Sequence, residues 1–169
     1  MTLPELAKQS IEFYLQNGRF LDLPKSLPLK FSKKGAAFVT LHKKDGDLRG
    51  CIGTFLPTQN SLAEEVIKNA VSAAVGDPRF FPVTRDELKD IEISVDVLEK
   101  PTNIKNVDEL DPKKFGIILT SPDGRCGLLL PDIDGVDTTR DQITITLQKA
   151  GINPGESYKI QKFKVIRYK

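Results

Sequence analysis

The hairpin signal near residue 45 constrains the fold more than any other feature of the chain. Asp45-Gly46 separates two segments, residues 36–41 and 48–55, that are rich in the residue types of β-strands. A two-residue turn of this type joins antiparallel neighbours, because glycine readily takes the positive φ that the turn requires. The sequence therefore predicts an antiparallel hairpin here.

Two helices are predicted from the residues at their ends. Residues 2–5 read Thr-Leu-Pro-Glu and residues 61–64 read Ser-Leu-Ala-Glu, and both have the spacing of a capping box. Apolar residues follow each box at helical spacing, until the Asn-Gly pair at 17–18 and until Gly76. One helix is therefore expected before the hairpin and one after it.

Residues 137–150 are ambiguous between helix and strand. Ile-Thr-Ile-Thr at 143–146 favours a strand, because β-branched residues lose side-chain freedom in a helix. An aspartate cap, the four-residue spacing of Ile143 and Leu147, and a closing Gly151 favour a helix. We expect a helix, and the strand is the alternative.

The remaining apolar segments are typical of strands. Residues 91–97 alternate apolar and polar side chains, as in a strand with one wet face. Segments 116–120 and 125–130 flank a Ser-Pro-Asp-Gly turn and form a second predicted hairpin. Residues 158–168 are expected to form one last strand at a sheet edge. Helices and strands that interleave without a repeat indicate an α+β fold.

The composition suits a globular chain with little net charge. Of its 169 residues 39% are hydrophobic, which is enough for one domain or two small subdomains. Its 25 Lys and Arg residues nearly balance 23 Asp and Glu residues, so it lacks the broad positive field of most nucleic-acid-binding proteins. Basic residues do gather at the C-terminus: Lys159, Lys162, Lys164, Arg167 and Lys169. These residues could contact an anionic partner. The preferred interpretation is that they are lysines that protect an edge strand from aggregation.

The few cysteine and histidine residues argue against metal and disulfide chemistry. Cys51 and Cys126 lie far apart in the sequence, and His42 is the one histidine, so neither a disulfide framework nor a zinc site is expected. We expect no metal and no cofactor. No apolar stretch has the length of a signal-peptide core or a membrane span, so a cytoplasmic protein with reduced thiols is expected.

The leading candidate for a functional site is Leu48 to Gly53, which reads Leu-Arg-Gly-Cys-Ile-Gly. In the register set by a two-residue turn, Thr40 faces Cys51 and His42 faces Arg49. One face of the hairpin then collects the reactive side chains, and the other face is apolar. The alternative is that Cys51 is a small core residue and Arg49 an ordinary surface charge.

This arrangement supports two kinds of site. An arginine beside a thiol favours the thiolate and a nearby histidine can take its proton, so Cys51, Arg49 and His42 are candidate catalytic residues. Alternatively, Arg49 holds a carboxylate or phosphate of a ligand, and Cys51 only packs. The residues alone leave both possibilities open.

A second candidate cluster spans residues 76–83. It reads Gly-Asp-Pro-Arg-Phe-Phe-Pro-Val, and its two prolines restrict the backbone. A rigid loop that presents an acid, a base and aromatic rings can frame a pocket. The simpler interpretation is an ordinary turn in which Arg79 pairs with Asp77.

Together these segments resemble the AMMECR domain family. The matching motifs run in order along nearly the whole chain, and the first of them is specific to the family. They are Leu48-Arg49-Gly50-Cys51-Ile52-Gly53, Asp77-Pro78-Arg79-Phe80 with Pro82-Val83, Glu92-Ile93-Ser94-Val95, Gly127-Leu128-Leu129-Leu130-Pro131 and Lys149-Ala150-Gly151.

The resemblance implies a single α+β domain of two unequal subdomains, each with an antiparallel sheet. The larger subdomain would span about residues 1–101 and 155–169, and the smaller about 102–154. The cleft between them would be lined by Leu48 to Gly53. Carried over onto this chain and combined with the hairpin register, the resemblance gives these candidate binding residues: Leu48, Gly50, Ile52, Gly53, Thr40, Asp77, Arg79 and Phe80.

The resemblance also implies partners. Bacterial relatives are similar to the A component of the AmmeMemoRadiSam system, which is associated with a Memo-like protein and a radical S-adenosylmethionine enzyme. The leading hypothesis is therefore an enzyme or enzyme component that acts on a protein or other large substrate through a Cys51 thiolate. The second is a non-catalytic peptide- or protein-binding module with Arg49 as its anchor. Nucleic-acid binding through the basic C-terminal strand is third, since the overall charge is balanced.

Overall fold

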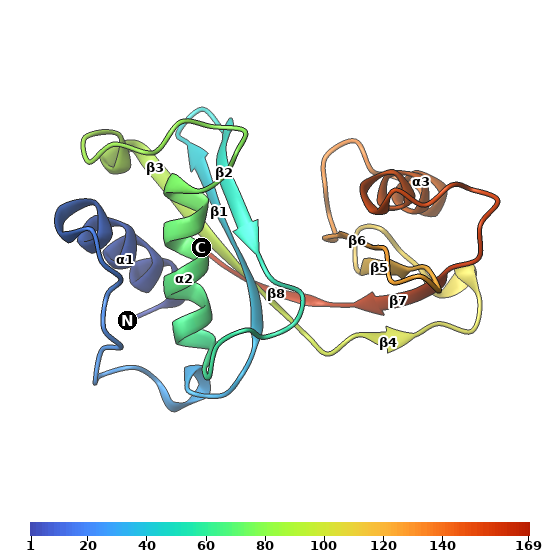
Figure 1. Ribbon diagram of the computed structural model, residues 1–169, viewed down its shortest axis with the longest axis horizontal. Helices are drawn as coiled ribbons and strands as arrows, with labels where there is room; N and C mark the ends of the chain where they lie inside the picture. The colour runs from blue at the N-terminus through green and yellow to red at the C-terminus, as the bar shows by residue number, and fades with distance from the viewer. The chain divides into compact units, whose positions relative to one another are not determined.

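Eight strands form two four-stranded sheets, one in each of two units of the chain (Figure 1). The computed structural model describes residues 1–169. Unit 1 comprises Met1–Val97 with Ile166–Lys169, and unit 2 comprises Leu98–Val165. The chain also contains three α-helices, so the predicted α+β class is confirmed. None of these helices combines the length and the apolar character needed to cross a bilayer.

Unit 1 is built on a sheet with the strand order β2-β1-β3-β8. Its strands are β1 (Ala36–Lys43), β2 (Leu48–Gly53), β3 (Ile91–Leu98) and β8 (Val165–Tyr168). Helices α1 (Leu3–Asn17) and α2 (Leu62–Val75) pack on one face of this sheet (Figure 1). The core between the helices and the sheet includes Leu6, Ile11, Val39, Val66 and Val95.

Both helices begin and end where the sequence predicts. Each starts with a complete capping box: Thr2 and Ser61 accept a hydrogen bond from a backbone N–H three residues on, and the glutamate there accepts one in return. Gly18 ends α1 with a φ of 68°, a conformation that glycine takes without strain. Local capping chemistry therefore sets the limits of the helices that cover the sheet.

Unit 2 contains the second sheet, with the strand order β4-β7-β5-β6. Its strands are β4 (Thr102–Asn103), β5 (Gly116–Thr120), β6 (Cys126–Leu129) and β7 (Lys159–Phe163). The helix α3 (Thr139–Ala150) packs against β5 and β6. A separate core forms between them and includes Ile117, Leu119, Leu129 and Leu147.

The ambiguous segment 137–150 is a helix, as expected. Thr138 caps it by accepting a hydrogen bond from the N–H of Asp141, and Gly151 ends it with a φ of 65°. Inside the helix the buried Thr146 hydroxyl donates to the carbonyl of Gln142 at 2.6 Å. Because the helix itself satisfies this hydroxyl, a β-branched residue is tolerated at a buried helical position.

The expectation of one edge strand over residues 158–168 was wrong. This segment forms β7 in unit 2 and β8 in unit 1, and Lys164 separates the two. The strand β7 is internal, because it pairs with β4 on one side and with β5 on the other. Residues 98–101 and 155–165 therefore lie in unit 2, and not in the larger unit. The pairing of β7 with β4 and β5 joins segments that are far apart in the sequence, so no local sequence pattern predicts it.

The first hairpin closes through three residues and not through the predicted two. Lys43 N–H donates to the carbonyl of Asp47, and Gly46, with a φ of 92°, donates to the carbonyl of Lys43, both at 2.9 Å. A three-residue turn of this kind needs glycine at its last position. The added turn residue shifts the pairing of the two strands by one position.

A bulge in β2 reverses that shift. His42 pairs with Leu48, whereas the next pair is Leu41 with Gly50, so Arg49 is the additional residue. The predicted pairing of His42 with Arg49 was therefore wrong. Beyond the bulge the two changes cancel, and the predicted pairings of Thr40 with Cys51 and of Phe38 with Gly53 are confirmed.

Candidate functional site at the Cys51 edge of unit 1

Cys51 lies on β2, the edge strand of the sheet in unit 1, among polar side chains. Its Sγ atom is 3.3 Å from Thr40 Oγ1 on the neighbouring strand, which is hydrogen-bond distance for a thiol and a hydroxyl. The backbone N–H and C=O groups of Cys51 have their partners outside the sheet. At an edge strand such groups would otherwise remain free to pair with another chain.

Asp77 and Arg79 supply these outside partners. Cys51 N–H donates to Asp77 Oδ2 at 2.9 Å, and Arg79 Nη2 lies 3.4 Å from the carbonyl oxygen of Cys51. Arg79 also donates to both oxygens of Asp77, from Nε at 3.0 Å and from Nη2 at 2.7 Å. The Asp77 side chain is 2% exposed and that of Arg79 is 55% exposed. The turn interpretation, in which Arg79 pairs with Asp77, is confirmed.

The electrostatics of this group favour a neutral thiol. The hydrogen bonds from Arg79 hold the pKa of Asp77 well below its usual range, although burial opposes them. Burial raises the pKa of the Cys51 thiol, and the Thr40 hydrogen bond and the positive charge of Arg79 offset only part of that effect. The pKa shift is thus opposite in direction to the one that a thiolate nucleophile requires.

Arg49 serves a different contact from the one expected. It forms a two-point ion pair with Glu87 of η2, the 3-10 turn Glu87–Asp90, with Nε at 2.5 Å and Nη2 at 3.1 Å from the carboxylate oxygens. These hydrogen bonds hold the pKa of Glu87 below its ordinary value. The Arg49 side chain is 10% exposed, and its Nη1 has no hydrogen-bond partner. Arg49 therefore fastens the bulge of β2 to η2.

His42 is not joined to the thiol. It is half-buried and pairs with Leu48 in the ladder, and its side chain makes no hydrogen bond or ion pair. In addition, no group of three or more His, Cys, Asp or Glu side chains is placed to hold a metal ion. The structure therefore brings Thr40 to Cys51 but leaves the candidate base out of contact.

The glycines beside Cys51 allow the chain to pack against itself. A Cβ atom on Gly50 would lie 2.2 Å from the carbonyl oxygen of Ala73 in α2, and one on Gly53 would lie 2.2 Å from the Phe38 ring. Ile52, between them, packs against the core of unit 1. The close approach that the sequence suggested at these glycines is thus an approach of the protein's own helix and ring.

Two further residues extend the polar group across the sheet, and the sequence analysis assigned neither of them to this site. Asp96 of β3 is 2% exposed and accepts hydrogen bonds from Arg167 of β8, at 2.7 Å from Nε and 2.8 Å from Nη2. The negative charge of Asp96 also contributes to the raised pKa of Cys51. The sequence shows Asp96 only as a polar position in an alternating strand, and its partner lies 71 positions away.

Comparison with known proteins decides the family of the chain. A family model described as AMMECR1 matches residues 4–169. The chain belongs to the AMMECR1 family. An AMMECR1 relative from Thermotoga maritima is 50% identical over 161 residues, which cover 94% of this chain and 92% of the relative. Protein CA_C1420 of Clostridium acetobutylicum is 46% identical over 98% of this chain, which spans 35% of that longer relative.

A solved structure shows the same fold. The crystal structure of the uncharacterized protein PH0010 from Pyrococcus horikoshii has a TM-score of 0.90 to this AMMECR1 chain at 33% sequence identity. The similarity covers 98% of this chain and 88% of PH0010. The resemblance drawn from the sequence motifs is therefore confirmed at the level of family and fold.

The basic C-terminus of this AMMECR1 chain is partly neutralised. Lys162 Nζ lies 2.9 Å from Glu109, and Arg167 pairs with Asp96. Two of the five clustered cations thus have a carboxylate partner within the protein. Pairing of these two cations lowers the positive charge that the segment can offer to phosphate groups.

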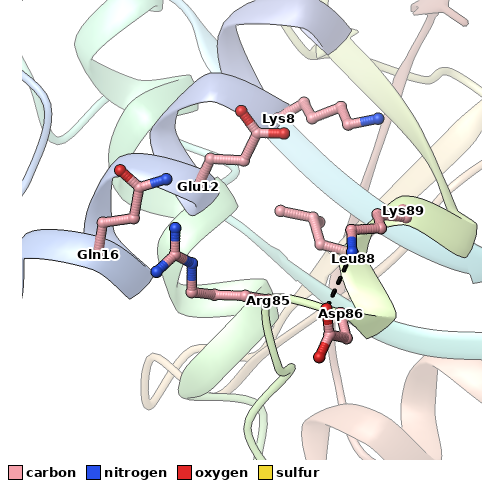
Figure 2. Close-up of a pocket in the computed structure, with 7 residues that line it drawn as sticks. All are labelled: Lys8, Glu12, Gln16, Arg85, Asp86, Leu88 and Lys89. Atoms are coloured by element: carbon pink, nitrogen blue, oxygen red, sulfur yellow. Dashed lines mark hydrogen bonds and ion pairs between the residues drawn. The ribbon is translucent and has the colours of Figure 1, made fainter.

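Unit 1 of the AMMECR1 chain also has a charged pocket of about 290 Å³ between α1 and the turn that precedes β3 (Figure 2). Lys89 Nζ donates a hydrogen bond to Asp86 at 2.9 Å, and Figure 2 marks this contact with a dashed line. Leu88 is the one buried residue of its lining, and the others are exposed charged or polar side chains. Because charges of both signs line this open surface, it selects no class of ligand.

Proposed function

We propose that the protein is a protein-binding component whose β2 edge recognises an apolar segment of a partner. The observation that carries this proposal is Phe81, which is 90% exposed although it is a large aromatic residue. Aromatic rings that become buried on association dominate the binding energy of many interfaces. Phe81 would be the main anchor, in place of the Arg49 anchor considered from the sequence.

The loop that presents Phe81 is fixed in the free protein. Pro78 and Pro82 flank residues 79–81 and restrict the backbone of this segment. Phe80 N–H donates to the carbonyl of Asp77 at 3.1 Å, and Val83 N–H donates to the carbonyl of Ala74 at 2.8 Å. A preformed loop loses little conformational entropy on binding, so more of the contact energy appears as affinity.

The neighbouring Phe80 ring helps to hold this loop against β2. The guanidinium groups of Arg79 and Arg49 lie 5.4 and 5.8 Å from the centre of the ring, within cation–π distance. Phe80 therefore links the loop to the bulge of β2. In the proposed complex it positions Phe81 and is not itself the anchor.

Other apolar side chains belong to β2 or to the loop that follows it. Leu48 is 37%, Phe55 38% and Leu56 61% exposed. The buried carboxylate of Glu65 holds that loop, because it accepts hydrogen bonds from the hydroxyls of Thr54 and Thr58 and from two backbone N–H groups. Exposed apolar side chains on a loop that is held in place favour association with a partner.

The charges beside this surface cancel in pairs. Arg49 and Arg79 each make a two-point contact with a carboxylate. A partner that relied on charge would have to compete with these internal pairs, which supports an apolar contact. The family resemblance makes a Memo-like protein and a radical S-adenosylmethionine enzyme the first partners to test.

The test compares two equally exposed apolar residues of unit 1. Phe81→Ala removes the proposed anchor, and Leu29→Ala, at a residue 87% exposed on the 3-10 turn η1 (Leu29–Phe31), is the matched control. Affinity for each partner from the same organism is measured by calorimetry. Phe81→Ala should weaken binding by about 30-fold, the effect of a hot spot of about 2 kcal/mol, and Leu29→Ala by less than about twofold. Equal affinities for the two variants would refute the proposal.

A second candidate function is covalent chemistry at Cys51, in an enzyme or enzyme component that acts on a protein or other large substrate. Its support is the half-buried thiol with the Thr40 hydroxyl and the Arg79 charge nearby. Since burial raises the pKa of this thiol, a substrate or partner would have to supply the base. Cys51→Ser should then abolish turnover and leave partner binding intact.

A further inference from the structure

We propose that unit 2 binds a small amphipathic anion, an apolar body with one acidic group, in a pocket beside β7. The pocket has a volume of about 640 Å³. Its lining comes from residues 103–107, from Thr120 at the end of β5 and from residues 158–161 at the start of β7. Small-molecule sites occupy roughly 300–1,000 Å³, so the size fits a ligand of one or two rings.

The pocket arises where two strands separate. The strand β4 is only two residues long, and its last pair joins Asn103 to Gln161. Ile104 N–H then makes a long contact of 3.5 Å with the carbonyl of Ile160, and the chain turns away into η3, the 3-10 turn Val107–Glu109. Meanwhile β7 extends to Lys159, which is paired only on its β5 side. The departure of β4 leaves this end of β7 uncovered.

The floor of the pocket is apolar. Ile104, Tyr158 and Ile160 are partly buried and pack against the core of unit 2. Val107, which is 50% exposed, lies on the wall that η3 provides. An apolar ring placed here would be shielded from water by side chains that the core already holds in position.

The wall formed by residues 105–109 is built without a ligand. Glu109 accepts hydrogen bonds from the N–H of Lys105 at 2.8 Å and from Lys162 Nζ at 2.9 Å. The hydrogen bond from Lys162 lowers the pKa of Glu109 to about 2. Asn106 caps η3, because its side chain accepts a hydrogen bond from the N–H of Asp108 at 2.8 Å. The turn that closes the pocket is therefore tied at both ends.

The charge of the lining selects an anion. Lys105 and Lys159 line the pocket, and no carboxylate does. Neither ammonium group forms an ion pair, whereas the nearby carboxylate of Glu109 is taken by Lys162. Two unpaired cations beside an apolar floor match a carboxylate, sulfonate or phosphate attached to an apolar body.

The experiment uses the full chain and the probe 8-anilinonaphthalene-1-sulfonate, which has an aromatic body and one sulfonate. A fluorescence titration should show one saturable site. In NMR spectra, the backbone amide signals that shift on addition of the probe should be those of residues 103–107 and 158–161. Replacing both cations, Lys105→Glu with Lys159→Glu, should weaken binding by about tenfold. The matched control Lys100→Glu, an exposed lysine of unit 2 outside the pocket, should change it by less than about twofold.

Two results would overturn the proposal. One is amide shifts that centre outside the lining residues, and the other is a doubly reversed variant that binds like the unmodified protein. If charge reversal lowers the thermal midpoint, Lys105→Gln with Lys159→Gln replaces it, with an expected loss of about threefold. Phe81→Ala should leave probe binding unchanged. The outcome of this test is therefore independent of the proposal that the β2 edge binds a protein partner.

Discussion

The backbone N–H of Cys51 donates to the carboxylate of Asp77 at 2.9 Å, across 26 positions of the chain. With Arg79 at the carbonyl of Cys51, both outward-facing backbone groups of this edge residue are occupied. An edge strand with free backbone groups is a template for pairing with other chains. The pair Asp77–Arg79 therefore closes the sheet edge at the thiol, and contacts with partners must be made through side chains.

Replacing Asp77 should lower stability through this contact. In Asp77→Asn the amide keeps the shape of the carboxylate but loses its charge-assisted bonds to Cys51 N–H and to Arg79. Because Arg79 is 55% exposed, water can solvate it afterwards, so the expected loss is about 2 kcal/mol at pH 7. Urea unfolding measures the loss, and Asp86→Asn, at a 96% exposed side chain, is the control and should stay within about 0.5 kcal/mol.

The same variant should show a defined pH dependence. The pKa of Asp77 is depressed in the folded protein, and its value in the unfolded chain is about 3.9. Its contribution to the free energy of unfolding is therefore fully present above about pH 5 and is lost as the pH falls below about 4. The gap between the protein and Asp77→Asn should shrink between pH 5 and pH 2. A gap that is constant over this range would show that charge is not the cause.

The Cys51 thiol should react slowly. Since burial raises its pKa, the midpoint of its alkylation rate should lie above that of an ordinary cysteine, about 8.5. Iodoacetamide kinetics from pH 6 to 10, in a Cys126→Ser background, give this midpoint. Thr40→Val should raise it further, because the Thr40 hydrogen bond lowers the pKa. A midpoint below 7 would restore the thiolate nucleophile expected from the sequence.

Gly50→Ala should destabilise unit 1. The new Cβ would lie 2.2 Å from the Ala73 carbonyl oxygen, a backbone atom that cannot move without shifting α2 against β2. Overpacking of this kind costs about 1–3 kcal/mol. Denaturant midpoints measure the change. Gly155→Ala, where no atom lies within 4 Å of the added Cβ, is the control and should leave the midpoint unchanged.

Glu65→Gln should loosen the loop that carries Phe55 and Leu56. Its two carboxylate oxygens accept hydrogen bonds from Thr54, Thr58 and Gln59, and these bonds outweigh burial and hold the pKa of Glu65 below its ordinary value. An amide cannot accept at both atoms, so we expect a loss of about 2 kcal/mol and faster proteolysis at residues 54–60. Glu12→Gln, at an exposed residue of α1, should change neither. Unchanged proteolysis in Glu65→Gln would rule out this role.

Patterns that are local in the sequence predicted the fold well. The capping boxes gave the starts of α1 and α2, because a cap joins residues only three positions apart. The pairing of Thr40 with Cys51 was also predicted, although through a turn of the wrong length. The assignment of residues 158–168 to a single strand failed, because sheet membership is decided by distant partners.

The candidate site could be predicted only in part. The motifs identify Cys51, Asp77 and Arg79, and the structure joins all three. They do not reveal the ion pair between Glu87 and Arg49, because this contact depends on a bulge and spans 38 positions of the sequence. Nor do they give the direction of the Cys51 pKa shift, because burial sets it and not the neighbouring arginine.

The three-residue turn and the bulge at Arg49 shift the pairing of β1 with β2 in opposite directions, so that their effects cancel. Lengthening the loop by one residue would, by itself, place the thiol on the side of β2 that packs on α2, where Gly50 leaves no room for it. The additional residue in the strand restores the frame before Cys51 is reached. The side of β2 on which the thiol lies therefore depends on the bulge at Arg49 as well as on the turn.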